Sequence, residues 1–289
     1  MSAILFPDAF TPMRVVNVAS VKHRSPFRYP GGKTWLVPRI REWLASLKRK
    51  PEVFAEPFAG GAIVGLSVIF DGLADKLTIV EKDEDVGAVW QAVLGGQGNE
   101  LANRICTFQV SEHTVRQVLA ARPTSVTERA FATVVRNRMQ RGGIMAAGAG
   151  LLKTGENGKG LMSRWYAETL KKRILDIAEH RDLIDFILGD GIAYMHANAR
   201  RSNIVFFIDP PYTVAGQRLY THSQLDHERL FAEVEKIKGD FLMTYDNAKP
   251  IRELAIAHGF DTQEIPMKNT HHAVMSELLI GRDLAWARP

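Results

Sequence analysis

Short apolar segments alternate with segments of helical length along most of the chain. The segments rich in β-branched and aromatic residues predict seven strands, at residues 53–55, 77–80, 186–188, 204–208, 241–244, 260–265 and 277–280. Most are separated by helical stretches such as 62–70, so the pattern predicts a largely parallel sheet with helices on both faces. The last two strands are joined by about ten residues without helical periodicity. These two are free to pair antiparallel and give a mixed edge.

The alternation breaks between about residues 103 and 185. Residues 111–121, 128–138 and 163–181 have helical patterns, whereas 141–160 contains seven glycines and few large apolar side chains. That glycine-rich stretch is poor core material and predicts an exposed loop or hairpin. We therefore expect an α/β fold with a Rossmann-like, mostly parallel, seven-stranded sheet. The sheet domain is formed by residues 1–102 and 186–289, and residues 103–185 form a helical and hairpin insertion.

Composition narrows the class of protein. Of the 289 residues, 46% are hydrophobic and 24% charged, as in ordinary soluble globular proteins. No apolar run approaches the roughly 20 residues of a membrane span, and residues 1–20 lack the pattern of a secretory signal. The single cysteine, Cys106, excludes an internal disulfide and a cysteine-cluster metal site. We expect a cytoplasmic protein that is a monomer or a weak dimer.

Positive charge is concentrated in the predicted insertion. The chain carries +5 overall, but residues 101–181 hold 14 Lys or Arg against 6 Asp or Glu, a balance of +8, which leaves −3 for the rest. A solvated helical surface is the simpler interpretation. Contact with nucleic-acid phosphates explains the concentration better.

The most specific motif is Asp209-Pro210-Pro211-Tyr212, directly after the strand at 204–208. Ligands of open parallel sheets bind beyond the carboxyl ends of the strands. Two prolines stiffen the loop and remove backbone donors. Asp209 and the Pro210 carbonyl supply two acceptors for the amine of adenine, and Tyr212 supplies an aromatic face for its ring. A proline-rich turn without chemistry remains the simpler alternative for this string alone.

A second motif joins the first predicted strand to a helix. The stretch 53–61 runs into a turn at Gly60-Gly61, the arrangement in which nucleotide-like ligands approach a backbone closely. Glu81 ends the next strand, at a separation that suits a carboxylate accepting hydrogen bonds from ribose hydroxyls. The full GxGxxG string is absent, so this turn does not by itself indicate a dinucleotide.

A third motif lies near the N-terminus. Gly32-Lys33-Thr34 resembles the end of a phosphate-binding P-loop, but the first required glycine would fall at Phe27 and no apolar strand precedes it. Lys33, at a glycine turn before a helix, instead suits contact with a ligand carboxylate.

Three segments in this order along the chain, Phe27 to Lys33, Glu56 to Gly61 and Asp209 to Tyr212, resemble the Dam-type family of DNA adenine-N6 methyltransferases, from about Pro26 onward. The resemblance implies the methyltransferase form of the sheet, S-adenosylmethionine as cofactor, and a target-recognition insertion between the donor-binding half and the catalytic motif. It implies catalytic roles for Asp209, Pro210, Pro211 and Tyr212. It implies cofactor contacts for Tyr29, Lys33, Glu56, Phe58, Gly60, Glu81, Asp190 and Asp209.

Two positions depart from the family pattern. The cofactor loop of the family reads Pro-Phe-x-Gly-x-Gly, but its second glycine is Ala62 here. Tyr29 stands where some relatives have tryptophan, which keeps an aromatic face. Residues 1–25 have no counterpart in the family.

The segment 136–143 resembles the start of the family's DNA-contacting hairpin. We expect DNA contacts from Arg136, Asn137, Arg138 and Arg141, since Arg and Asn pair bidentately with guanine and adenine edges. Contacts to phosphates alone are an equally good alternative. No metal is expected, because the histidines lack the spacing of a ligand set and methyl transfer needs none.

The expected function is methylation of a flipped-out adenine in double-stranded DNA, in a bacterial or phage-infected cell and with no membrane partner. Two alternatives remain open at this point: a cytosine-N4 DNA methyltransferase, and a DNA-binding protein that keeps the fold without catalysis. The recognition sequence and the presence of a partner restriction enzyme are also open.

Overall fold

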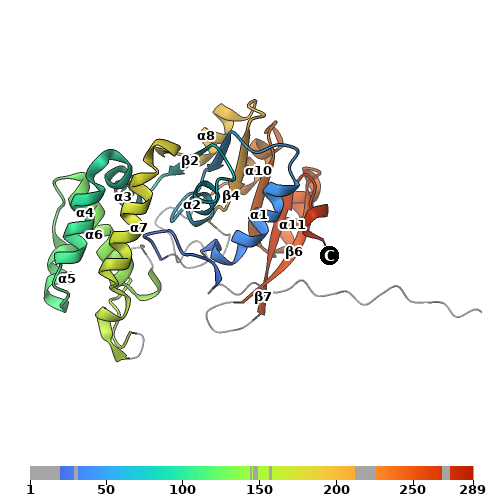
Figure 1. The fold of residues 1–289 in the computed structure, drawn as a ribbon. Coiled ribbons are helices and arrows are strands. Elements are labelled where there is room, and N and C mark those ends of the chain that lie inside the picture. The colour runs from blue at the N-terminus through green and yellow to red at the C-terminus, as the bar shows by residue number, and fades with distance from the viewer. Residues whose placement is uncertain are drawn as a thin grey trace, which may run out of the picture.

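A computed structural model describes residues 20–28, 32–143, 145, 149–155, 158–211, 225–268 and 274–288. A seven-stranded sheet with the order β3-β2-β1-β4-β5-β7-β6 runs through the molecule (Figure 1). Its strands are β1 (Val53–Glu56), β2 (Lys76–Glu81), β3 (Ile184–Leu188), β4 (Ile204–Ile208), β5 (Phe241–Asp246), β6 (Asp261–Lys268) and β7 (Val274–Gly281). The first five strands pair in parallel, and β7 pairs antiparallel with both β5 and β6. The predicted α/β class, the mostly parallel sheet and the antiparallel edge are confirmed.

Alternation along the central strands sends side chains into two separate cores. Phe54 on β1 and Phe207 on β4 point into a core shared with α1 (Val37–Ser46), α2 (Ile63–Phe70) and α3 (Glu84–Ala92). Ala55 and Phe206, their neighbours in sequence, point to the opposite face. That face is covered by α8 (Gly191–Asn198), α10 (His227–Glu235) and α11 (Lys249–Ala257). Successive strand residues face opposite ways, so these largely apolar strands are those of a sheet buried on both sides.

The helices that follow α3 and precede β3 form a group beside the sheet (Figure 1). They are α4 (Gly98–Thr107), α5 (Glu112–Ala120), α6 (Val126–Met139) and α7 (Ala167–Glu179). A π-helical turn, η3 (Val93–Gln97), links α3 to α4. Helix α6 packs along α3 and α7 packs along α4, and their apolar side chains join the core of α1, α2 and α3. The helical group therefore shares a core with one face of the sheet.

Local signals explain where the helices of this group begin. Ser111 caps α5 in a capping box with Thr114, and the Ser125 hydroxyl caps α6 by accepting the Glu128 amide at 3.2 Å.

The helix expected at 163–181 is divided, because the 3₁₀ turn η6 (Gly160–Arg164) ends before α7 begins. Part of the hairpin expected at 141–160 is described: a 3₁₀ turn, η4 (Arg141–Gly143), and one antiparallel bridge between Gln140 and Leu151.

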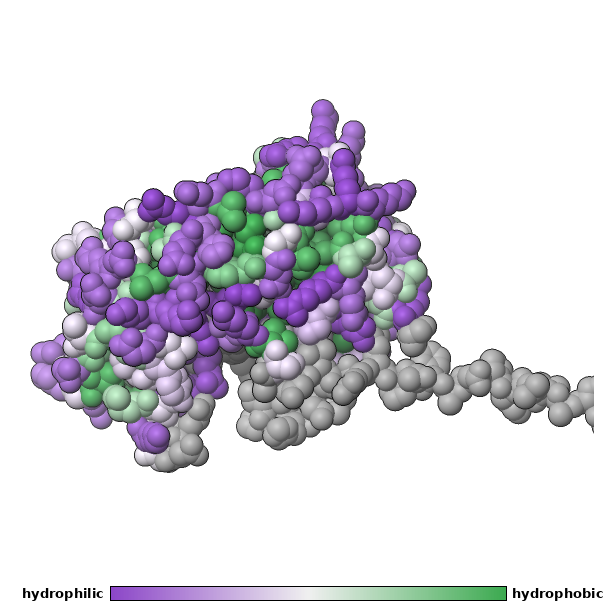
Figure 2. Space-filling model, in the orientation of Figure 1, coloured by the Kyte–Doolittle hydropathy of each residue, from purple (hydrophilic) through white to green (hydrophobic). Residues whose placement is uncertain are grey.

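The remaining elements are short 3₁₀ turns: η2 (Lys33–Leu36), η7 (Arg181–Leu183) and η8 (Ala285–Ala287). Among the described helices, none has the length and apolar character required to cross a membrane. The face in Figure 2 is mostly hydrophilic, with smaller hydrophobic areas between the polar side chains.

Candidate active site

The turn that follows β1 carries two left-handed residues. Gly60 has φ +46° and Ala62 has φ +47°, and the Ala62 amide donates to the Ala59 carbonyl at 2.6 Å before α2 begins. Glycine adopts this conformation freely, whereas alanine does so at a cost of about 1 kcal/mol. Ala62 therefore keeps the backbone conformation for which glycine is favoured, in the place of the family's second glycine.

Glu81, at the end of β2, holds this turn from the neighbouring strand. Its Oε2 accepts the Gly60 amide at 2.8 Å, and its Oε1 accepts the amides of Lys82 and Asp83, each at 2.8 Å. Burial raises the pKa of Glu81, and the three amide hydrogen bonds oppose that rise. A carboxylate has about four acceptor positions. Among the described residues three are used, which leaves one on Oε2 for a ligand hydroxyl.

Glu56, the last residue of β1, is 4% exposed. Its Oε1 accepts the Gly65 amide at 2.6 Å. Burial, with a smaller contribution from the charge of Asp209, raises the pKa of Glu56 to about 8. The group is therefore mostly protonated at neutral pH, which limits the negative charge beside Asp209.

Asp209 follows β4 and is held by side chains from two other parts of the chain, Thr244 and Lys33. The Thr244 hydroxyl on β5 donates to its Oδ1 at 2.7 Å. The buried Lys33 ammonium lies 3.1 Å from the same oxygen and 3.5 Å from Glu277 Oε1 on β7. Lys33 thus pairs with carboxylates of the protein, a role that the sequence did not indicate.

Sequence reasoning missed Thr244 and Glu277. Thr244 ends the strand predicted at 241–244, so it shares with Glu81 the signal of a polar residue where a strand ends. In the sequence, Glu277 is a single acidic residue at the start of an apolar strand, and nothing near it indicates a functional role. Its partner Lys33 is distant in sequence, so no local pattern connects them.

These groups surround a cavity of about 440 Å³ beyond the carboxyl ends of β1, β2 and β4. Its walls include Phe27, Lys33, Glu56, Phe58, Gly60, Glu81, Asp190, Asp209 and Pro211. Small-molecule pockets occupy roughly 300–1,000 Å³, so the cavity has the size for a nucleoside-like ligand. Tyr29 and Tyr212 lie outside the described residues.

Asp190 caps α8 at the rim of this cavity. Its Oδ1 accepts the Ala193 amide at 3.0 Å, and its Oδ2 lies 3.3 Å from Lys82 Nζ. Partial burial opposes ionisation, but these contacts outweigh it and lower the pKa of Asp190. Gly191 lies so close to Pro57 that a Cβ there would meet the Pro57 carbonyl oxygen at 2.0 Å. Glycine at this position lets α8 approach the turn after β1.

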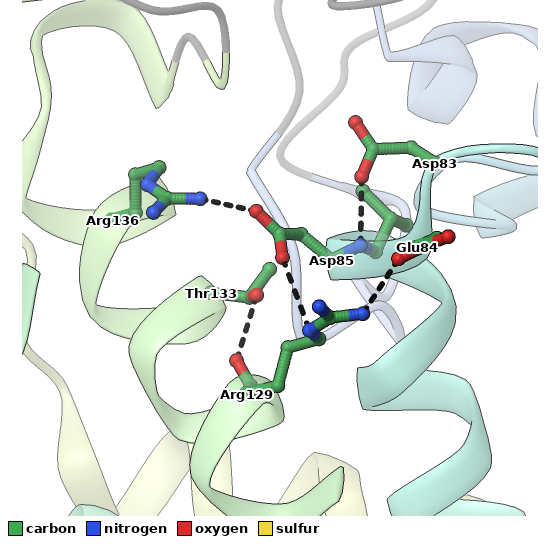
Figure 3. Close-up of polar contacts among 7 residues, drawn as sticks. Asp83, Glu84, Asp85, Arg129, Thr133 and Arg136 are labelled. Atoms are coloured by element: carbon green, nitrogen blue, oxygen red, sulfur yellow. Dashed lines mark hydrogen bonds and ion pairs between the residues drawn. The ribbon is translucent and has the colours of Figure 1, made fainter. Parts of the chain in front are cut away.

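Most side chains of the segment expected to contact DNA instead contact other residues of the protein. Arg136 Nη1 is 2.5 Å from Asp85 Oδ2, and Arg129 Nη1 is 2.8 Å from Glu84 Oε2 (Figure 3). These pairs join α6 to the start of α3, which Asp83 caps through the Asp85 amide at 2.8 Å. Arg136 is therefore directed toward α3.

Asn137 and Arg138 are buried, at 1% and 6% exposure. The Asn137 amide bonds to the backbone of Arg28, and Arg138 Nη2 donates to the Pro26 carbonyl at 2.5 Å. Burial, and then the neighbouring arginines, lower the pKa of Arg138 to about 9. As placed, neither side chain reaches outward, in contrast to the expectation of base contacts. Of the four expected DNA-binding residues, Arg141 is exposed.

Among the described residues, no group of three or more His, Cys, Asp or Glu side chains is arranged to bind a metal ion. His227 shares a hydrogen bond of 2.9 Å with the Tyr245 hydroxyl, and His222, His271 and His272 lie outside the described residues. The expectation that the chemistry needs no metal stays a prediction.

Strand order, the antiparallel edge and a cavity at the strand ends define the α/β fold of S-adenosylmethionine-dependent methyltransferases. Residues 29–92 match the profile of the family described as D12 class N6 adenine-specific DNA methyltransferase. The match covers Gly32-Lys33-Thr34 near the N-terminus and the cofactor loop, but not the Asp209 motif. It confirms the resemblance over that part of the chain, and with it S-adenosylmethionine as the cofactor.

Solved structures similar to this chain have low sequence identity. A putative RNA methyltransferase, PH1948 from Pyrococcus horikoshii, is 11% identical with a TM-score of 0.41, covering 91% of this chain and 92% of that one. The rRNA methyltransferase aviRa from Streptomyces viridochromogenes is 13% identical with a TM-score of 0.41, covering 88% and 87%. TrmK of M. capricolum, in complex with S-adenosyl-homocysteine, is 10% identical with a TM-score of 0.37, covering 85% and 68%. Comparison with curated protein sequences gave no match.

Proposed function

We propose that the protein transfers a methyl group from S-adenosylmethionine to the exocyclic N6 amine of adenine in double-stranded DNA. The observation that carries the proposal is the arrangement of Asp209. Its carboxylate stands at the end of β4, beside the cavity, held by Lys33 and Thr244 and followed by two prolines. The family match over residues 29–92 supports adenine as the target.

The cavity residues fit the methyl donor. Glu81 keeps one acceptor position on Oε2 for a ribose hydroxyl, while the Gly60 turn and the half-buried Phe58 line the same space. Asp190, at the rim, is placed for the amine of the donor's adenine. When bound, S-adenosylmethionine supplies an electrophilic methyl group on a positively charged sulfur.

The side chains around Asp209 prepare an acceptor for the target amine. The Asp209 carboxylate and the Pro210 carbonyl accept the two amine hydrogens, which fixes the nitrogen lone pair and raises its electron density. Lys33 and Thr244 keep Asp209 in place before the target base arrives, and such preorganisation is a major source of catalysis. The bond from the donor's sulfur to the methyl carbon breaks as the bond to nitrogen forms, which leaves S-adenosylhomocysteine, and the nitrogen releases one proton to Asp209 or to water. No covalent enzyme intermediate is required.

The DNA part of the proposal rests on charge and on the family match. Residues 1–102 and 186–289 form the catalytic domain in this proposal, and residues 103–185, with most of the excess positive charge, form the target-recognition part. The target adenine leaves the base stack, because its amine is otherwise out of reach, and Tyr212 stacks on its ring. Arg141 is the exposed candidate for contact with DNA.

A labelled-donor experiment tests the proposal. The protein is incubated with methyl-labelled S-adenosylmethionine and a duplex that contains all short sequence contexts, and the DNA is then digested to nucleosides. We expect the label in N6-methyladenine. Label in N4-methylcytosine would support the cytosine alternative, and label only in a parallel RNA substrate would replace DNA as the target. A duplex that is bound but not labelled would support the non-catalytic alternative.

A further inference from the structure

Ser25, Phe27 and Arg28 contribute to one wall of the cavity. Side chains from α6 and α7 hydrogen-bond to the backbone of this stretch. Arg173 Nη1 donates to the Ser25 carbonyl at 3.1 Å, Arg138 Nη2 donates to the Pro26 carbonyl at 2.5 Å, and Asn137 bonds to Arg28. Buried backbone groups need partners. This wall therefore depends on the two helices that flank the expected DNA hairpin.

The Asn137 side chain hydrogen-bonds to both the amide and the carbonyl of the Arg28 backbone. Its Oδ1 accepts the Arg28 amide at 2.8 Å, and its Nδ2 donates to the Arg28 carbonyl at 2.9 Å and to the Gly143 carbonyl at 3.1 Å. Both amide hydrogens and one oxygen lone pair are thus used. A bidentate contact to an adenine edge would require breaking these bonds.

Gly143 completes the contact from the other side. A Cβ at this residue would meet the Arg28 carbonyl oxygen at 2.3 Å, and its φ of +76° favours glycine. We call the contact of Arg28 with Asn137 and Gly143 the Arg28 clamp. It joins the start of the expected DNA hairpin to the residue that precedes Tyr29 in the sequence.

A chain of contacts leads from the clamp to the cofactor loop. Phe27 is buried, and its ring centroid lies 5.8 Å from that of Trp90 on α3. The Trp90 indole Nε1 donates to the Gly60 carbonyl at 3.0 Å, and the Gly60 amide donates to Glu81. A displacement of Arg28 would therefore reach the turn that lines the donor site.

Helix α6 also contacts a second wall of the cavity, the one that includes Glu81 and Asp83. Arg136 pairs with Asp85, and Arg129 with Glu84, at the start of α3 (Figure 3). Asp85 lies four residues after Glu81. These pairs are partly exposed and contribute less than the buried clamp. Both walls of the cavity are nevertheless attached to one helix.

We infer that Asn137 is a positioning residue for the methyl donor, and that the segment 136–143 couples donor binding to contact with the target. The inference rests on the proposed function, because it assumes that the cavity binds S-adenosylmethionine. It assigns Asn137 to the shape of the donor site in place of base recognition. Ligands that order a shared element favour each other's binding, so donor and DNA bind with positive cooperativity.

Calorimetric titration with S-adenosylhomocysteine, without DNA, tests the inference. Asn137→Ala is expected to raise the Kd at least about tenfold, which corresponds to one or two lost hydrogen bonds. Asn103→Ala, at an exposed position of α4, is the matched control and should keep the wild-type Kd. Gly143→Ala should also weaken binding, whereas Gly150→Ala, which has no atom within 4 Å of its added Cβ, should not.

Wild-type affinity in Asn137→Ala would overturn the inference, and a changed DNA sequence preference at unchanged donor affinity would assign Asn137 to base reading. If wild type itself does not bind S-adenosylhomocysteine, the proposed function fails instead. Circular dichroism shows whether each variant folds.

Hydrogen exchange of the wild-type protein gives a second test that needs no variant. Saturating S-adenosylhomocysteine should slow amide exchange in peptides covering 25–28 and 136–143, as well as in those covering 56–62 and 81–83. Slower exchange at 56–62 and 81–83 alone would show that the donor site and α6 are uncoupled.

Discussion

The rim of the cavity and the inner side of α6 are both rich in polar side chains, but they use them differently. At the rim, Glu81 and Asp209 accept hydrogen bonds from the protein and still border open space. On α6, Asn137 and Arg138 are buried against residues 25–28. The rim has hydrogen-bonding capacity to offer a ligand, whereas the α6 side chains use most of theirs to hold the chain together.

The difference shows when a polar residue in a sequence can be assigned a function. The carboxyl ends of parallel strands meet at one edge of a sheet, so an acid after a strand has a predictable position. A polar residue on a helix has no such constraint. Whether Asn137 faces DNA or the protein depends on what packs against α6.

The largest effect is expected from the rim. In the proposed mechanism the negative charge of Asp209 holds the target amine, so we expect Asp209→Asn to lower methyl transfer on the order of 10³-fold. The label incorporated per minute measures it. Asp240→Asn, an exposed change of the same kind just before β5, is the control. S-adenosylhomocysteine binding should remain measurable in both variants, and full activity in Asp209→Asn would remove this residue from the mechanism.

Two glycines near the rim, Gly191 and Gly189, allow the packing of α8 against the turn after β1 to be tested by protein stability alone. Gly191→Ala would place a methyl group 2.0 Å from the Pro57 carbonyl oxygen, so we expect unfolding free energy to fall by about 3 kcal/mol. Gly189→Ala places its methyl group in ordinary contact, 3.6 Å from Ile187, and should cost little. Urea denaturation measures both. Equal stability of the two variants would contradict the close approach of α8 to the turn.

The raised pKa of Glu56 predicts a pH effect on stability. A carboxyl with a folded pKa of about 8 and an unfolded value near 4.5 stays neutral when folded but ionises when unfolded. Its contribution to stability is therefore complete below about pH 4.5 and decreases as pH rises toward 8. Between pH 5 and pH 7 the loss is roughly 2–3 kcal/mol.

Glu56→Gln keeps an acceptor for the Gly65 amide and removes this ionisation. The melting temperature of the variant relative to wild type should increase steadily with pH across that range. A pH-independent difference between the two proteins would show that Glu56 is ionised in the folded state.

The smallest expected effect, on donor affinity, compares the rim with the buried side of α6 directly. Glu81→Gln leaves one acceptor oxygen for three amides and a ligand hydroxyl, so we expect S-adenosylhomocysteine to bind about tenfold more weakly. Glu100→Gln, at an exposed position of α4, is the matched control. If Asn137→Ala weakens binding as much as Glu81→Gln, the buried side of α6 matters to the donor as much as the rim does.

Most of the sheet could be predicted from the sequence because its strands are short, apolar and separated by helical stretches. All seven predicted strands are present, and the pair without a helix between them is antiparallel. The helix expected at 163–181 was predicted too long, because α7 begins only after a 3₁₀ turn. Periodicity is similar in the two kinds of helix over so few residues.

The site could be predicted where its residues follow strands, and not where they depend on distant partners. Glu81 and Asp209 lie at the cavity as the motifs indicated. The contact of Lys33 with Glu277, and that of Asn137 with Arg28, join segments more than 100 residues apart. No local signal encodes such pairs, since they arise from packing.

The contact of Lys33 with Asp209 and Glu277 has a consequence for synthesis on the ribosome. The lysine emerges early, while both acids that accompany its buried ammonium are translated much later. A buried ammonium without partners is strongly unfavourable, so the N-terminal motif cannot take its final place until β7 has been made and paired. The site around Asp209 would therefore be assembled only after the last strands of the sheet have been translated.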